Sequence, residues 1–321
     1  MSSGLKEYLV YATDPAGNTS ETVRVIMNVR WDKVIDADMT LSATNVSWDG
    51  KDILVSGATL TLDGEHSFGR VVVTNGGKIA CAVSPSAAET NRVHLEARYV
   101  YVSTNSSIDV SATSRRSASA YGVGGSHGGR GVSPNANVSA PAYGSLTEPV
   151  DAGMMGGGYG GGALFLRADE LVLEGALRAN GQSSSSGGGS AGGSIWVDAG
   201  VLSGSGTIQA IGGGTGSTSL GAGGGGRIAI YYGDAAAFQP AQVSAAGGAR
   251  YSSYYKHGGA GTVYWKDKQA ALGRLVVDNT PRVAADSAET ELSAPVDMPL
   301  EVVNANLRLL GDHVFTQPVE M

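Results

Sequence analysis

The sequence predicts an all-β chain whose main part is a right-handed parallel β-helix, a solenoid with glycine-rich loops. Of the 321 residues, 49 are glycine, whereas charged residues make up only 16% of the chain and aromatic residues 7%. Glycine at this density would destabilise helices, by about 1 kcal/mol per residue relative to alanine. Short alternating runs of polar and apolar residues, typical of strands, are separated by turn residues over residues 34–112. Further strands then recur at a nearly constant spacing, which is typical of stacked coils.

The first 30 residues predict a β-hairpin that precedes the solenoid. Two alternating strands, at residues 8–12 and 22–29, flank a turn at residues 14–18. The pair resembles the last two strands of the Ig-like repeats of bacterial surface proteins. Residues 1–30 are therefore expected to be the C-terminal hairpin of an Ig-like domain, and residues 31–321 the β-helix.

Four strands that each follow a glycine define the repeat. They occupy residues 162–167, 193–198, 226–231 and 261–266, so their starts are 31, 33 and 35 residues apart. A second short apolar motif follows each of the first three strands. Neighbouring copies run in the same direction, so we expect parallel pairing at about 4.8 Å. The side chains expected to face the interior are Ile195, Val197, Ile208, Ile228, Ile230 and Val243.

Glycine is concentrated in one stretch, since 39 of the 49 glycines lie between Gly122 and Gly261. Two roles are expected for them, corners with positive φ and close backbone approach between coils. Part of the stretch is open to another interpretation, extended polyglycine with polyproline-II-like geometry. Residues 111–161 show no periodic apolar pattern, so a long, only partly ordered Gly/Ser-rich insertion is expected there.

One eleven-residue pattern occurs twice, at residues 58–68 and at residues 305–315. Six positions are identical at a single offset, and a seventh is acidic in both copies. In the first copy we expect a structural corner, in which His66 caps turn carbonyls and Phe68 begins a buried strand; a metal or acid–base site is the alternative. The repeat also suggests a piece of a longer protein in which the module recurs.

The order of these motifs resembles a known class of proteins. A Leu-x-Leu-x-Gly-x-His-x-Phe coil is followed by a glycine loop containing Tyr143-Gly-Ser-Leu-Thr-Glu-Pro149, and then by Gly-Gly-Ser-Ile-Trp-Val and Gly-Arg-Ile-Ala-Ile-Tyr-Tyr232. This order is similar to the glycine-rich parallel β-helical segments of large bacterial surface or secreted proteins, which often lie beside Ig-like or Rhs/YD-repeat regions. The resemblance covers about residues 50–270. It implies an extracellular or cell-surface location and carries no catalytic residue set.

Composition and residue order exclude several classes of function. The equivalent positions of the four repeat strands read Arg167, Asp198, Tyr231 and Lys266, without the neighbouring carboxylates that glycoside hydrolysis requires. No cofactor motif or metal-ligand set is present, and Cys81 has no partner for an intrachain disulfide. The net charge of −7 argues against nucleic-acid binding, and no apolar run is long enough for membrane insertion.

A non-catalytic stalk, spacer or adhesive surface of a large exported bacterial protein is therefore the expected function. The alternatives are a polysaccharide-active lyase or hydrolase on the same fold and a carbohydrate-binding module. Expected partners are a surface polysaccharide, another cell-surface protein and neighbouring domains of the same chain.

One loop, at residues 249–257, is the candidate ligand-binding site. Its aromatic faces could stack on sugar rings while its cations pair with acidic groups. The alternative is that its tyrosines only shield the backbone of the adjacent coil. The candidate residues are Arg250, Tyr251, Tyr254, Tyr255 and Lys256.

Overall fold

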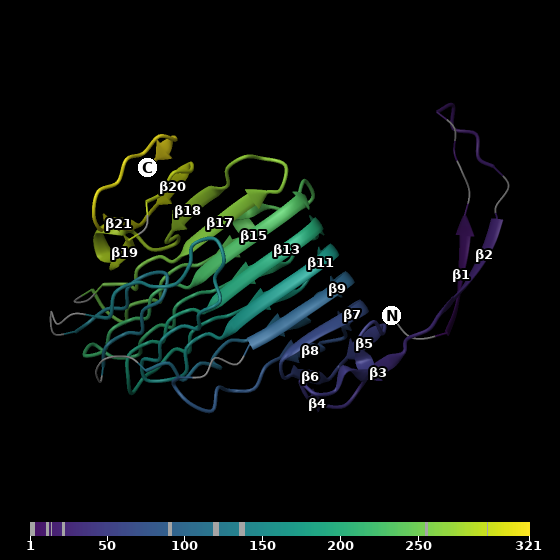
Figure 1. Ribbon diagram of the computed structural model, residues 1–321, viewed down its shortest axis with the longest axis horizontal. Helices are drawn as coiled ribbons and strands as arrows, with labels where there is room; N and C mark the ends of the chain where they lie inside the picture. Colours follow the sequence, from purple (N-terminus) through teal and green to yellow (C-terminus); the bar gives the residue numbers. More distant parts are fainter. Residues whose placement is uncertain are drawn as a thin grey trace.

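The computed structural model describes residues 4–10, 13, 15–20, 23–88, 92–117, 122–134, 139–253, 256–293 and 295–321. In this part of the chain, regular structure is almost entirely β, as predicted (Figure 1). The helical elements there are three short 3-10 turns, η1 (Val46–Trp48), η2 (Pro240–Gln242) and η3 (Ala284–Asp286).

Two large sheets organise the molecule. The larger sheet has eleven strands, in the spatial order β3 (Lys33–Ile35), β5 (Ile53–Ser56), β7 (Glu65–Thr74), β9 (Arg92–Val102), β11 (Ala163–Leu173), β13 (Ser194–Ser203), β15 (Arg227–Asp234), β17 (Thr262–Asp267), β18 (Arg274–Asp278), β20 (Leu300–Val303) and β22 (Val319–Glu320). The smaller sheet has seven strands, β4 (Met39–Leu41), β6 (Thr59–Leu62), β8 (Lys78–Ala80), β10 (Ser107–Asp109), β12 (Ala176–Arg178), β14 (Thr207–Gln209) and β16 (Val243–Ser244).

Two short pairs complete the topology. Strands β1 (Gly4–Val10) and β2 (Val23–Val29) form the predicted antiparallel hairpin, which Figure 1 shows extending from the stacked sheets. Strands β19 (Glu289–Leu292) and β21 (Asn306–Leu309) pair in parallel.

From β3 to β17 the chain alternates between the two sheets. Each odd-numbered strand joins the larger sheet, each even-numbered strand joins the smaller one, and every pairing along this stretch is parallel. The four strands expected after glycine are β11, β13, β15 and β17, paired in the expected register, for example Ile195 with Ile228. Each turn of chain thus adds one strand to each sheet.

The space between the two sheets holds the first apolar core. Because side chains alternate along a strand, every second residue of the larger sheet points into this space. Five of the six side chains expected to face the interior are fully buried there, and Val243 is half-buried against the same core. Cys81 is buried in this core as well, and burial raises the pKa of its thiol to about 11.

Among the described strands of residues 31–321, the expected parallel order is interrupted where β17 meets β18. Strands β17 and β18 are antiparallel, with Tyr264 opposite Leu275. Val263 belongs to the first core, whereas Tyr264 and Leu275 belong to a second core on the opposite face of the sheet. The apolar side chains of the strands after β17 therefore pack mainly on the face of the larger sheet that lies away from the first core.

The glycine-rich segments form a bundle of extended chains, which we call the glycine bundle (residues 122–132, 153–161, 179–193, 210–226 and 245–261, in their described parts). Three consecutive peptide N–H groups donate to three different neighbours. Those of Gly223, Gly224 and Gly225 bond the carbonyls of Gly213, Gly125 and Gly259, at 2.9 Å each. A polyproline-II helix has three residues per turn, so its successive N–H groups point outward in three directions. The polyglycine interpretation of the sequence therefore fits this bundle.

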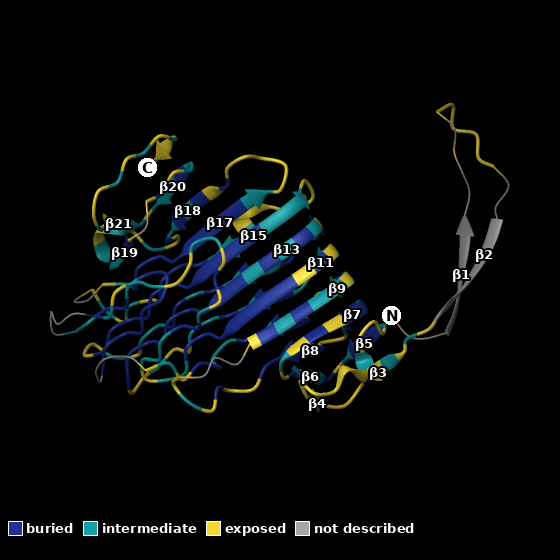
Figure 2. Cartoon of the chain, viewed as in Figure 1, coloured by how far each residue is buried: buried dark blue, intermediate teal, exposed yellow. Residues whose placement is uncertain are grey.

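Close approach, rather than positive φ, is the main reason for glycine in the bundle. Between residues 122 and 261, the described glycines with positive φ are Gly122, Gly144 and Gly204. A Cβ added to Gly224 would lie 2.1 Å from the carbonyl oxygen of Gly129, and one added to Gly192 would lie 2.1 Å from that of Ala210. Figure 2 shows the bundle buried along most of its length. The expected corner role thus applies to few of these glycines.

The insertion at residues 111–161 also differs from expectation. Two of its described parts, residues 122–132 and 153–161, enter the glycine bundle: the N–H of Gly125 bonds the carbonyl of Gly189 at 2.9 Å, and that of Gly153 bonds the carbonyl of Gly161 at 2.8 Å. Residues 122–129 are all buried. A stretch without apolar periodicity is therefore ordered here by backbone hydrogen bonds instead of by side-chain packing.

Replacing Ile228 with Asp is expected to destabilise the protein by at least about 3 kcal/mol, because the carboxylate would be buried without a partner. Val34, half exposed on β3, is the matched position, and Val34→Asp should change the free energy of unfolding by less than about 0.5 kcal/mol. Urea denaturation measures both. Equal stabilities of the two variants would contradict the assignment of the core.

Replacing Gly224 with Ala should destabilise the protein by about 1–3 kcal/mol or more, because the new methyl group meets a backbone carbonyl. Gly216 is exposed in the same bundle, and the nearest atom to its added Cβ is the Cβ of Ser185 at 3.2 Å. Gly216→Ala should therefore cost much less. Thermal unfolding of both variants tests the bundle, and a Gly224→Ala variant as stable as Gly216→Ala would disprove its packing.

Candidate functional site

The twice-occurring corner has the structural role predicted for it. Nε2 of His66 lies 3.1 Å from the carbonyl oxygen of Asp63, and Nε2 of His313 lies 3.2 Å from that of Leu310. Because a carbonyl only accepts, both rings donate. Each imidazole also stacks on the phenylalanine two residues later, with ring centroids 5.9 Å and 6.2 Å apart. The two copies of the pattern therefore fold into the same capped turn.

The outer face of the larger sheet, opposite the first core, carries a line of alternating charges that we call the charged row. Register places Glu96, Arg167, Asp198, Tyr231 and Lys266 side by side, as the repeat alignment predicts for the last four. Arg167 pairs with Glu96 and with Asp198, at 3.2 Å each. Asp198 also pairs with Lys268, whose Nζ lies 2.5 Å from its carboxylate.

The charged row continues onto β7. His94 lies between two carboxylates, 3.3 Å from Glu65 and 3.5 Å from Glu96, and Arg92 reaches Glu65 at 3.1 Å. A cation or an imidazole thus separates each carboxylate of this row from the next. These pairs are largely exposed, so each stabilises the fold by at most about 1 kcal/mol.

Beside the charges runs a line of rings, which we call the aromatic row. His94, Phe165 and Trp196 occupy paired positions on β9, β11 and β13, with centroid separations of 4.5 Å and 4.9 Å. Tyr231 and Tyr264 extend the row at 6.2 Å and 5.7 Å, into the second core. This row was not predicted from the sequence, although it occupies alternate positions of the same repeat strands.

Residues 139–151, the covering segment, lie over part of this outer face. The phenol of Tyr231 donates to the carbonyl of Thr147 at 3.1 Å, and Ser194 Oγ donates to that of Asp151 at 2.5 Å. Arg227, fully buried on β15, donates to the carbonyl of Tyr143 at 2.6 Å and to Thr262 Oγ1 at 3.0 Å. Burial lowers the pKa of Arg227 to about 10. The segment is therefore fixed to the sheet by buried polar groups.

His127 lies beneath the covering segment. Its Nδ1 donates to the carbonyl of Gly192 at 2.9 Å, while Nε2 is buried without a hydrogen-bond partner in the described part of the chain. Its ring packs on Tyr143, 4.8 Å away. Burial, and then the nearby Arg227, lower the pKa of His127 to about 3. The imidazole is therefore neutral at physiological pH.

The loop predicted from the sequence as a ligand site is described only in part. Tyr254 and Tyr255 lie outside the described residues. Arg250 is engaged by Asp286 at 2.8 Å, and its backbone N–H bonds His257 Nδ1 at 3.0 Å. Tyr251 is 62% exposed, and Lys256 is exposed as well. The proposed role of this loop stays a prediction.

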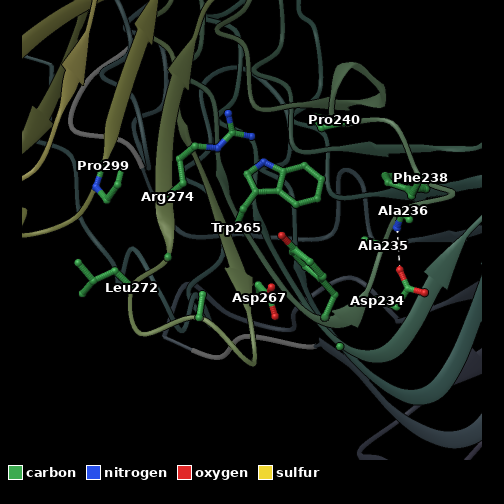
Figure 3. Close-up of a pocket in the computed structure, with 14 residues that line it drawn as sticks. Asp234, Ala235, Ala236, Phe238, Pro240, Trp265, Asp267, Leu272, Arg274 and Pro299 are labelled. Atoms are coloured by element: carbon green, nitrogen blue, oxygen red, sulfur yellow. Dashed lines mark hydrogen bonds between the residues drawn. The ribbon is translucent and has the colours of Figure 1, made fainter.

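A crevice of about 560 Å³ opens near the end of the first core, between the β15–β16 connection and the β17–β18 hairpin (Figure 3). Trp265 and Tyr232 line it together with two carboxylates. Asp234 accepts from the N–H of Ala236 at 2.9 Å, the bond drawn in Figure 3, and Asp267 accepts from that of Gln269 at 2.8 Å. Both carboxylates therefore stabilise their own turns.

Comparison with known proteins adds no relative. No protein-family model, curated protein or solved structure matches the chain. Within the described ranges, no group of three or more His, Cys, Asp or Glu side chains is arranged to hold a metal ion. Among the helices of the same ranges, none has the length and apolar character needed to cross a membrane.

The neutral His127 predicts a dependence of stability on pH. The pKa of histidine in the unfolded chain is about 6.5, whereas that of folded His127 is about 3. Between these values the unfolded chain binds the extra proton, so the free energy of unfolding falls as the pH falls through this window.

His127→Gln removes this proton, so its stability should decline less between pH 6.5 and pH 4. The difference in slope from the wild type approaches about 1.4 kcal/mol per pH unit at most. Urea denaturation across this range measures it, and the wild type serves as the reference for all other titrating groups. Parallel pH profiles of the two proteins would refute the buried, neutral state of His127.

Proposed function

We propose that this chain is a non-catalytic structural and adhesive module, a stalk, spacer or binding surface, of a large exported bacterial protein. The observation that carries the proposal is the in-register stack of parallel strands from β3 to β17 over one continuous core. Such a stack is stiff, and its length grows with the number of coils while its surface varies freely. The proposal places the module outside the cell or at its surface, as the family resemblance implies.

The finer architecture belongs to the same proposal. Strands that alternate between two sheets in parallel are consistent with a β-helix, and parallel crossover connections are right-handed in about 98% of cases. We therefore take the coils from β3 to β17 as a right-handed solenoid. The hairpin β1–β2 is taken as the end of an Ig-like domain.

Two features favour an adhesive role over a purely mechanical one. The outer face of the larger sheet displays the aromatic row beside the charged row, and both remain partly exposed next to the covering segment. Aromatic rings beside polar side chains suit contacts with sugars and with proteins. The partners we propose are a surface polysaccharide, another cell-surface protein and neighbouring domains of the same chain.

A second candidate, a polysaccharide lyase or hydrolase, rests on the crevice that contains Asp234, Asp267 and Trp265. Catalysis there would need one carboxyl group as acid and another as base or nucleophile. Both carboxylates accept hydrogen bonds from their own turns. This structural engagement supports the non-catalytic proposal.

Incubation with pectin, alginate, xylan and bacterial capsular polysaccharides is expected to release neither reducing ends nor unsaturated products. The comparison variants are Asp234→Asn and Asp267→Asn, which keep an acceptor oxygen for the turn. Product formation by the wild type that both variants lose would overturn the non-catalytic proposal in favour of the second candidate.

A further inference from the structure

A groove of about 320 Å³ lies on the outer face of the larger sheet, where the aromatic row emerges from beneath the covering segment. Strand β9 contributes Arg92, His94 and Glu96 to its lining, β11 contributes Phe165 and Arg167, and β13 contributes Trp196. Pro149 and Val150, at the end of the covering segment, form one wall. The groove thus combines an aromatic floor with a polar rim.

The floor consists of aromatic rings that strand pairing holds in place, with the Phe165 and Trp196 rings edge to face at an interplanar angle of 77°. Phe165 is nearly buried, with His94 4.5 Å away on one side and Trp196 4.9 Å away on the other. The guanidinium of Arg167 lies 5.3 Å from the Phe165 ring. These planar groups are held by strand pairing on both sides, so binding a ligand would order little additional chain.

The rim supplies both donors and acceptors but little net charge. Arg167 is shared between Glu96 and Asp198, and Arg92 is balanced by Glu65. A carboxylate or phosphate ligand would have to compete with these acidic partners for the guanidinium groups. An uncharged ligand with many hydroxyl groups can donate to the carboxylates and accept from the arginines while each ion pair stays in place.

We infer that this groove binds neutral pyranose rings of a polysaccharide, with one apolar sugar face against the half-buried Trp196 ring and the hydroxyl groups on the Glu96–Arg167 rim. The volume of the groove is near the lower end of the range of about 300–1,000 Å³ that is usual for ligand sites. The groove therefore accommodates a short stretch of a polysaccharide. The inference rests on the proposed adhesive function, because it names the ligand class of that surface.

The test is titration of the wild type with neutral cello-, manno-, malto- and xylo-oligosaccharides, with oligogalacturonate as the acidic counterpart. Calorimetry measures the affinity for each oligosaccharide. Saturable binding of at least one neutral oligosaccharide is expected, at least tenfold tighter than binding of oligogalacturonate. Binding of oligogalacturonate alone, or of none of these sugars, would overturn the inference.

Three variants localise the site. Val150→Arg places a long side chain into the groove from an exposed wall position, so it should weaken binding at least tenfold without changing thermal stability. Glu96→Gln keeps the shape of the groove but removes a negative charge that pairs with Arg167. The binding preference of this variant should therefore shift toward oligogalacturonate. Val201→Arg, at an exposed valine of β13 that does not line the groove, is the matched control and should bind as the wild type does.

Tyr251→Ala tests the alternative site in the loop at residues 249–257. Loss of binding in this variant but not in Val150→Arg would assign the sugar to that loop and overturn the groove, while leaving the adhesive proposal intact. Cleavage of a bound oligosaccharide would instead overturn the non-catalytic proposal. The two failures are therefore distinguishable in the same set of titrations.

Discussion

The close contact of bare backbone with bare backbone in the glycine bundle is the constraint on which the rest of the structure depends. Each coil from β10 to β17 leaves the smaller sheet, passes through the bundle and returns to the larger sheet. Peptide groups there lie so close that a methyl group would meet a carbonyl at about 2 Å. Every glycine has a high entropic cost on folding, and the bundle offsets this cost by pairing buried N–H and C=O groups with neighbouring chains.

The larger sheet serves two cores because the chain reverses between β17 and β18. Before the reversal, the apolar side chains pack toward the smaller sheet; afterwards they pack on the opposite face. The aromatic row links the two regions, since Phe165 lies beside the exposed rim and Tyr264 lies within the second core. The outer face is therefore partly buried in packing contacts and partly exposed, and the boundary between these parts is the covering segment.

Buried polar groups hold that boundary in place. Arg227, Ser194 and Tyr231 each bond a backbone carbonyl of the covering segment. Arg130 adds a largely buried ion pair to Glu291 at 2.8 Å, and Glu291 also accepts from the N–H of Ala142. Removing either member of such a pair leaves a charge without its partner in a poorly solvated place. The wall formed by Pro149 and Val150 consequently lies between two carbonyls, those of Thr147 and Asp151, that are bonded to the sheet.

The sequence by itself determined the four repeat strands, the repeat side chains that face the first core and the capped corner at His66. These properties depend on side-chain alternation and on turns of a few residues, which are local. The need for glycine was also visible in the composition, but its cause, close approach in a three-directional bundle, was only one of the interpretations open. Only the tertiary structure decided the chain reversal, the position of the covering segment and the combination of the aromatic and charged rows into a groove. Each of these depends on contacts between residues far apart in the chain, such as Arg130 and Glu291, and the periodicity of a strand contains no information about which distant segment will pack on its outer face.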